Sequence, residues 1–222
     1  MRLTALAPAP GLWASVPLLG VDFTSRPDRR KPVLLAQGEC ATGVVVLRAL
    51  HRFDTLGRLA DWLRSQPRWA GGFDLPFGLP RELVLAWKWP TDWTGCIDRL
   101  VGLDRAELRA RFVAFCASRP AGAKFAHRAC DRPAGSSPSM KWVNPPVAWM
   151  LHAGVPLLRS ARAHFPAHED AQPGAPRVAL EAYPGLLARE VIGRRSYKSD
   201  DAARQTADRH LACQAIVEAL EA

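Results

Sequence analysis

Long apolar runs and paired cysteines are both missing from this chain of 222 residues. No apolar segment approaches the roughly 18 residues that a transmembrane helix needs, so the sequence predicts no membrane span. The 5 cysteines are scattered, odd in number and never spaced as C-x-x-C, which argues against a disulfide scaffold and against a zinc site. Because disulfide scaffolds belong to oxidising compartments, we expect a cytoplasmic protein.

Acidic residues are fewer than basic ones, 21 against 30, which gives a net charge of +9 and an isoelectric point near 9.9. A basic surface attracts phosphates, so nucleic acid is the partner that we expect. Most of the basic residues are arginines spread among alanine, glycine and proline, a pattern that GC-rich coding also produces. The charge alone therefore leaves two explanations open.

The length of the chain fits one large domain. Residues 1–15 contain one arginine and a weak apolar stretch broken by prolines, so we expect a tail rather than a signal peptide. Residues 16–222 are expected to form a single domain, with an irregular insertion around 118–176 that is rich in glycine, proline and basic residues.

The first half of the domain predicts a mixed β-sheet. Apolar runs predict strands over 16–23, 32–37 and 43–53, and the turn before the third is short enough for an antiparallel hairpin. An amphipathic helix follows over 55–65, and a short strand, "WAGGFD", occupies 69–74. Three strands, a helix and a further strand predict at least one crossover connection.

The second half predicts mainly helices. The clearest covers 104–117, where Asp104 and Glu107 fit a capping box. A short helix should follow "NPP" and end at Gly154, and a further helix should begin at Pro184 and end at Gly193. The residues expected on the buried side of the helix over 104–117 are Leu108, Phe112 and Phe115. A last helix over about 200–219 should bury Ala203, Ala207, Leu211, Ala215 and Ile216.

Three acidic residues share one sequence context. Asp22 ends "LLGVD", Asp74 ends "GGFD" and Glu181 ends "VALE", so each follows an apolar strand and precedes a turn. If these strands are parallel, their carboxyl ends meet at one edge of the sheet, where α/β proteins bind ligands. Carboxylates gathered there repel one another unless a cation such as Mg²⁺ neutralises them. The alternative is that each acid is a helix cap or a turn former.

Two further segments fit a phosphate-containing ligand. "GRRSYKSDD" places Arg194, Arg195 and Lys198 before the last helix, and basic side chains near a helix N-terminus form an anion site. The segment is also compatible with a solvated loop. "WKWPTDW" surrounds Lys88 with tryptophans, which stack on bases in some proteins and serve as packing in more of them.

Five motifs in succession resemble one known family. "GVDFTS", "GGFDLPFGLPR", "NPPVAWMLHAGVPLL", "VALEAYPGLLAR" and "GRRSYKSD" are similar to the ordered blocks of domain-of-unknown-function family 429, over about residues 17 to 215. That family is described as predicted nucleases with a ribonuclease H-like fold. The resemblance implies an α/β fold with a five-stranded mixed sheet flanked by helices. Strands 1–3 would form an antiparallel meander, and strands 1, 4 and 5 would be parallel.

The resemblance also implies roles for the acids. In ribonuclease H-like nucleases, acids on the first and fourth strands bind the metals, and these positions correspond to Asp22 and Asp74. Glu181 would be a third ligand or a substrate-binding group. Such enzymes commonly carry a further acid on a late helix, and Asp200, Asp201 or Asp208 would supply it here, unless it lies on a C-terminal segment outside this sequence.

The leading hypothesis is therefore a metal-dependent nuclease or phosphodiesterase that uses Mg²⁺ or Mn²⁺ in two-metal-type hydrolysis of nucleic acid. A second hypothesis is a phosphotransferase or ATPase related to the sugar-kinase and actin fold, because "GVDFTS" resembles their first phosphate loop. In that loop Thr24 and Ser25 would contact phosphate. A third hypothesis is a nucleic-acid-binding module without catalysis.

Overall fold

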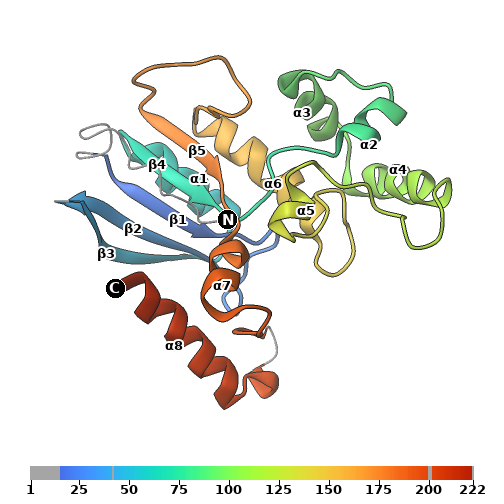
Figure 1. Ribbon diagram of the computed structural model, residues 1–222. Coiled ribbons are helices and arrows are strands. Elements are labelled where there is room, and N and C mark those ends of the chain that lie inside the picture. Colours follow the sequence, from blue (N-terminus) through green and yellow to red (C-terminus); the bar gives the residue numbers. More distant parts are fainter. Residues whose placement is uncertain (1–15, 42, 200–201, 222) are drawn as a thin grey trace.

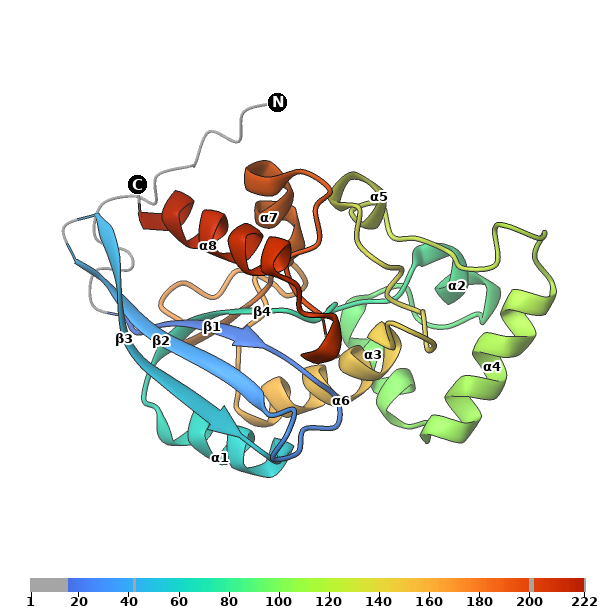
Figure 2. The same ribbon diagram turned by 90° about the horizontal axis from the view of Figure 1, so that it is seen from below.

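The computed structural model describes residues 16–41, 43–199 and 202–221 (Figure 1). The tail expected over residues 1–15 and the two acids Asp200 and Asp201 lie outside these ranges. A five-stranded sheet in the order β3-β2-β1-β4-β5 forms the centre, with helices on both of its faces (Figures 1 and 2). In the described part of the chain, no helix combines the length and the hydrophobicity that crossing a bilayer requires.

The sheet confirms the predicted arrangement of strands. Strand β1 (Leu18–Asp22) pairs antiparallel with β2 (Val33–Ala41), which pairs antiparallel with β3 (Val44–Phe53). Strand β4 (Trp69–Phe73) is parallel to β1 and to β5 (Arg177–Glu181) on its other side. The carboxyl ends of β1, β4 and β5 therefore lie at one edge of the sheet.

Helices α1 (Leu56–Ser65) and α6 (Val147–Ser160) cover one face of the sheet, and α7 (Pro184–Ile192) and α8 (Ala207–Glu221) lie over the other (Figure 2). Helix α1 begins where expected, because the Thr55 side chain accepts a hydrogen bond from the Arg58 amide. Helix α7 also has the predicted bounds and is followed by Gly193, whose φ of 64° suits glycine.

The predicted end of α6 at Gly154 is wrong, because the helix continues for another six residues to Ser160. Gly154 serves close packing instead of termination. A Cβ atom at this position would lie 2.9 Å from both methyl groups of Leu75 and 3.2 Å from the ring of Phe23. Glycine lets the helix approach the segments that follow β4 and β1, which is a tertiary requirement that a local pattern does not show.

The last helix differs from its prediction in both its start and its buried face. Helix α8 begins at Ala207, and a short 3₁₀ helix, η1 (Ala202–Arg204), precedes it. Among its described residues only Ala212 is buried. The helix packs on α7 and not into the core, so only a narrow stripe is covered. Of the residues expected to be buried, Ala203, Ala207 and Leu211 are exposed, and Ala215 and Ile216 are half-buried.

A group of helices lies beyond the carboxyl edge of the parallel strands (Figure 1). Its members are α2 (Arg81–Ala86), α3 (Trp93–Val101), α4 (Arg105–Ala117) and the short α5 (Asp131–Ala134). Helix α4 confirms the predicted capping box of Asp104 and Glu107, and its three expected core residues are buried. Helices α2 and α3 were not predicted, because prolines and tryptophans interrupt the apolar pattern on which the prediction rested.

The tryptophans of "WKWPTDW" are used in packing. Trp87 and Trp89 contact each other with ring centroids 4.7 Å apart, and Trp87 lies 5.4 Å from Phe112 of the core. The Trp93 Nε1 donates a 2.6 Å hydrogen bond to the carbonyl of Phe77. These contacts favour the packing interpretation of this segment over base stacking.

Candidate functional site

Asp22 and Asp74 lie side by side at the carboxyl edge of the sheet. Asp22 is the last residue of β1, and Asp74 directly follows β4. The parallel register places Val21 beside Phe73, so the next residue of each strand is at the same level. The Asp74 amide donates a 2.9 Å hydrogen bond to the Val21 carbonyl, which carries the pairing one residue beyond β4.

The charge on Asp74 is costly in this position. Burial and, after it, the negative charge of Asp22 raise the pKa of the Asp74 carboxyl from 3.8 to about 6, a rise that Lys198 partly opposes. The exposed Asp22 and the half-buried Asp74 are thus close enough to repel each other. A cation between the two carboxylates would relieve this repulsion.

The sequence around Asp74 explains why the acid stays at the edge of the sheet and does not enter a helix. A Cβ atom on Gly71 would lie 2.8 Å from the Phe73 ring and 3.3 Å from the Leu19 Cβ, so glycine lets β4 fit closely against β1. After Asp74 the chain turns at once, because the Leu75 amide donates to the Phe73 carbonyl at 2.8 Å. Pro76 keeps Leu75 out of a helical conformation.

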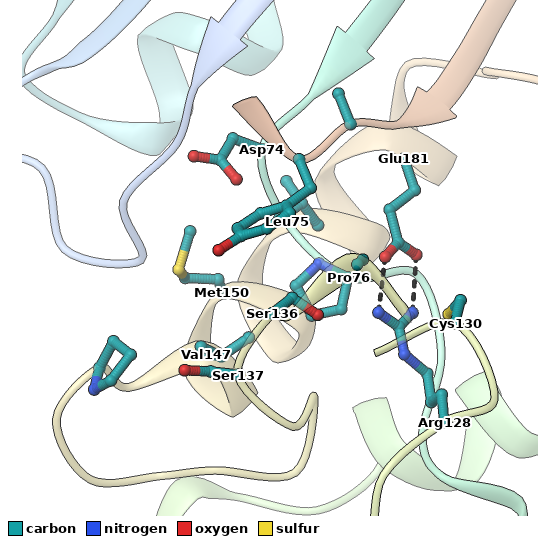
Figure 3. A pocket seen from close by; sticks show the side chains of 14 residues that line it. Asp74, Leu75, Pro76, Arg128, Cys130, Ser136, Ser137, Val147, Met150 and Glu181 are labelled. Carbon is teal, nitrogen blue, oxygen red and sulfur yellow. Dashed lines mark hydrogen bonds and ion pairs between the residues drawn. The ribbon is translucent and has the colours of Figure 1, made fainter. Parts of the chain in front are cut away.

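Glu181 lies at the same edge but faces another partner. Its carboxylate accepts hydrogen bonds from both terminal nitrogens of Arg128, at 2.7 and 2.6 Å, and from the Phe77 amide at 2.8 Å (Figure 3). Figure 3 shows the Asp74 carboxylate pointing away from this pair. The structure therefore brings Asp22 and Asp74 together and directs Glu181 to Arg128, and a ligand role for Glu181 stays a prediction.

Arg128 is a residue that the sequence analysis missed. Its guanidinium also binds Asp131, through Nε at 3.0 Å and Nη2 at 2.8 Å, and the Asp131 side chain is fully buried. Burial lowers the pKa of the Arg128 guanidinium, but the hydrogen bonds and charges of Glu181 and Asp131 outweigh this and raise it above its ordinary value. In the sequence, only the short spacing of Arg128 and Asp131 could have indicated that this arginine forms an ion pair.

A cavity of about 270 Å³ opens beside Asp74 (Figure 3). It is formed by the chain after β4, the segment around α5, the start of α6 and the residues after β5. A second cavity of about 650 Å³ lies on the far side of the Arg128–Glu181 pair and shares that pair, Cys130 and Tyr183 as its wall. The acid pair is therefore next to a concave surface that extends past Glu181.

The predicted phosphate-binding residues are only partly gathered at the site. Lys198 is near enough to Asp74 to lower its pKa, which places it beside the acid pair. Arg194 is exposed, and the Arg195 Nε donates to the Ile192 carbonyl at 3.1 Å. Thr24 and Ser25 are half-buried in the loop that follows Asp22.

A second basic group, also missed from the sequence, borders that loop. The Arg105 Nη2 donates to the Ser25 carbonyl at 3.4 Å, and its guanidinium carbon lies 5.4 Å from the centre of the Trp149 ring. Burial lowers the pKa of Arg105, and the positive charge of Arg26 lowers it further. Arg26 of the loop after Asp22 and Arg105 at the start of α4 thus place two like charges close together, which favours an anion between them.

The described residues contain no group of three or more His, Cys, Asp or Glu side chains arranged to hold a metal ion. The carboxylates that the structure brings together are therefore two, Asp22 and Asp74. The further acids proposed from the sequence, Asp200 and Asp201, lie outside the described ranges. Asp208 lies at the start of α8, in a hollow lined also by Arg195 and Arg209.

Comparison of the chain with protein-family models, with curated proteins and with solved structures finds no match. The resemblance to family 429 consequently stays a proposal, and the function has to be argued from the geometry of the site.

Proposed function

We propose that the protein is a metal-dependent phosphodiesterase that acts on nucleic acid. The observation that carries the proposal is the pair of carboxylates Asp22 and Asp74, held level on adjacent parallel strands, with the pKa of Asp74 raised to about 6 by burial and by Asp22. Perturbed acids in a cleft are typical of functional sites. The surrounding basic residues and the net charge of +9 favour a phosphate-containing substrate.

The topology supports the proposal of a ribonuclease H-like fold. An antiparallel meander of β1, β2 and β3, with β4 and β5 added parallel to β1, is the arrangement that the resemblance to family 429 implies. The two acids lie at the carboxyl ends of the first and fourth strands, where that fold carries metal ligands. This agreement in the position of the acids does not depend on the raised pKa of Asp74, so it supports the proposal separately.

The two carboxylates fit a hard divalent cation. Mg²⁺ is typically held by one or two carboxylates and keeps several of its waters, and Mn²⁺ accepts the same oxygen ligands. Such an ion relieves the electrostatic repulsion between Asp22 and the half-buried Asp74. Bound there, the ion would supply an activated water and stabilise the leaving oxygen. A second ion, as in two-metal hydrolysis, would need acids in addition to this pair.

The remaining residues have separate tasks in this proposal. Phosphates of the nucleic-acid strand are held by Lys198, beside the acid pair, and by Arg26 of the loop after β1 with Arg105 at the start of α4. Glu181 fixes Arg128 and the Phe77 amide, so it positions the chain after Asp74 without contacting the reacting phosphate.

The test is cleavage of labelled single-stranded, duplex, hybrid and branched DNA and RNA with Mn²⁺. Wild-type protein should cleave at least one substrate, and Asp74→Asn should lower the rate by about a hundredfold or more, because a metal ligand is lost. Asp61→Asn is the matched control, since Asp61 is an exposed acid of α1. The proposal is abandoned if no substrate is cleaved, or if Asp74→Asn cleaves like the control.

Two binding measurements beside the cleavage assay separate the two alternatives. A module without catalysis would bind nucleic acid with an affinity that falls steeply with salt, yet give no product. A phosphotransferase would bind ATP with Mg²⁺ tightly in calorimetry, and Thr24→Ala or Ser25→Ala would weaken that binding.

A further inference from the structure

The cavity beside Asp74 has a mixed lining. Apolar side chains in the lining include Leu75, Pro76, Val147 and Met150. The polar groups in the lining include Ser136, Ser137 and the Arg128–Glu181 pair, and Tyr183 and Cys130 also line the cavity. Apolar walls with a few polar groups are typical of sites that bind small organic ligands or parts of larger ones.

The charges of this cavity do not suit a phosphate. Arg128 is the one basic residue that lines it among the described residues, and its guanidinium already binds both Glu181 and the buried Asp131. Asp74, also in the lining, carries a further negative charge when ionised. An anion would therefore be repelled from the cavity and drawn to Lys198 or Arg105 outside it. The ligand that fits is a neutral group with apolar faces and polar edges.

The volume of the cavity and the aromatic side chain in its lining favour a ligand that contains a single planar ring system. A volume of about 270 Å³ is slightly below the range of roughly 300–1,000 Å³ that is usual for drug-sized ligands. Tyr183 is 39% exposed and lines both this cavity and the larger one. The guanidinium carbon of Arg189 lies 5.5 Å from the ring centroid, which orders the ring. An ordered aromatic ring of this kind is a stacking surface for a nucleobase.

We propose that this cavity receives one unpaired nucleobase of the nucleic acid whose phosphate lies at Asp22 and Asp74. The inference rests on the proposed function, and it adds the class of substrate. The cavity admits one base and not a base pair, so the base must leave its helical stack before it enters. Unpaired or damaged strands give up a base at the lowest cost. The substrate is thus single-stranded or locally unpaired nucleic acid.

The first test is binding, and it is independent of catalysis. The affinity of the full chain for a nucleoside 5′-monophosphate and for ribose 5-phosphate is measured by calorimetry, with and without Mn²⁺. Because the sugar phosphate is common to both, the ratio of the two affinities isolates the base. We expect the nucleotide to bind at least about tenfold more tightly, as stacking of one base predicts. Equal affinities would overturn the proposal.

A variant that fills the cavity should remove this preference. Met150→Trp puts a larger side chain on the apolar wall and is expected to bring the two affinities within about twofold of each other. Leu85→Trp, at an exposed site of α2 outside the cavity lining, is the matched control and should keep the wild-type ratio. Retention of the full ratio in Met150→Trp would place the base elsewhere and overturn the proposal.

A measurement on the unmodified protein covers the case in which Met150→Trp does not fold. Cys130 lines the cavity and is exposed, and Cys213 of α8 is exposed but outside it. A nucleoside monophosphate should slow alkylation of Cys130 severalfold, measured by peptide mass spectrometry, and leave Cys213 unchanged. Ribose 5-phosphate should protect neither. Absence of any difference between nucleotide and sugar phosphate at Cys130 would refute the assignment.

Catalysis distinguishes this inference from the proposed function. A labelled oligomer of abasic tetrahydrofuran nucleotides is a phosphodiester chain without a nucleobase or any other aromatic ring. If the wild type hydrolyses it, Met150→Trp should leave that rate within about twofold while reducing cleavage of a single-stranded oligonucleotide at least about tenfold. Equal effects on both substrates would refute the base site alone. Absence of all hydrolysis would refute the proposed function, and the binding and alkylation results would still decide on the cavity.

Discussion

Asp74 is predicted to reduce the stability of the folded protein at neutral pH. Its carboxyl has a pKa of about 6 in the folded chain, against 3.8 for an unperturbed aspartate. At roughly 1.4 kcal/mol per pH unit, the difference corresponds to about 3 kcal/mol at most. The folded state binds the proton more tightly than the unfolded state, so the favourable contribution is complete below pH 3.8 and is lost as the pH rises through about 6.

Asp74→Asn removes this penalty, because the amide carries no charge at any pH. Urea unfolding at pH 4 to 8 should show the variant more stable than wild type by about 1 to 3 kcal/mol at pH 8, with the difference shrinking toward zero near pH 4. Asp61→Asn on α1 should show no such trend. Active-site residues often reduce stability in this manner, so a more stable and less active variant is the expected result.

The same urea unfolding measurements, repeated with a divalent metal ion, test whether the acid pair binds metal. An ion that binds only the folded protein stabilises it by RT ln(1 + [M]/Kd), so 100 times the dissociation constant adds about 2.7 kcal/mol. Mn²⁺ should therefore raise the stability of wild type at pH 8 and have little effect on Asp74→Asn. A variant that is equally destabilised at every pH, or that gains as much from Mn²⁺ as wild type, would refute the reasoning.

Three further predictions concern the surroundings of the acid pair. Glu181→Gln keeps an acceptor for the chain after Asp74 but loses the charged pair with Arg128, so urea unfolding should show a loss of about 2 kcal/mol. Arg105→Ala should weaken nucleic-acid binding across sequences and lower the slope of log affinity against log salt by about 1, measured by fluorescence anisotropy. Lys198→Ala should raise the pKa of Asp74 above 6 in a carbon NMR titration, because a positive charge that lowers it is removed. An unchanged unfolding midpoint, salt slope or titration curve, respectively, would contradict each one.

The strand pattern made the sheet predictable from the sequence. Apolar runs and turns predicted the strands, short connections predicted the antiparallel hairpin, and the resemblance to family 429 supplied the parallel arrangement of β1, β4 and β5. The acids at strand ends followed from the same pattern, since a parallel sheet places the carboxyl ends of its strands together. Asp22 and Asp74 meet because β1 and β4 are immediate neighbours.

Contacts between segments that are far apart in the sequence could not be predicted from these local patterns. Arg128 and Glu181 are separated by 53 positions, and no local periodicity links them. Gly154 looked like a helix terminator because its role depends on Leu75 and Phe23 in other segments. The exposed side of α8 was also misjudged, because an apolar stripe on a helix does not reveal how wide a surface will cover it.

The register of β4 against β1 makes the proposed chemistry sensitive to small changes in chain length. Successive side chains of a strand point to opposite faces, so a slip of one residue would turn Asp74 to the other side of the sheet while leaving most backbone pairing available. Inserting one residue between Trp69 and Phe73 would therefore change the face of the sheet on which Asp74 lies. It would turn Asp74 away from Asp22 and also take the buried Phe73 off the core face, so the packing of the core and the pairing of the acids depend on the same register.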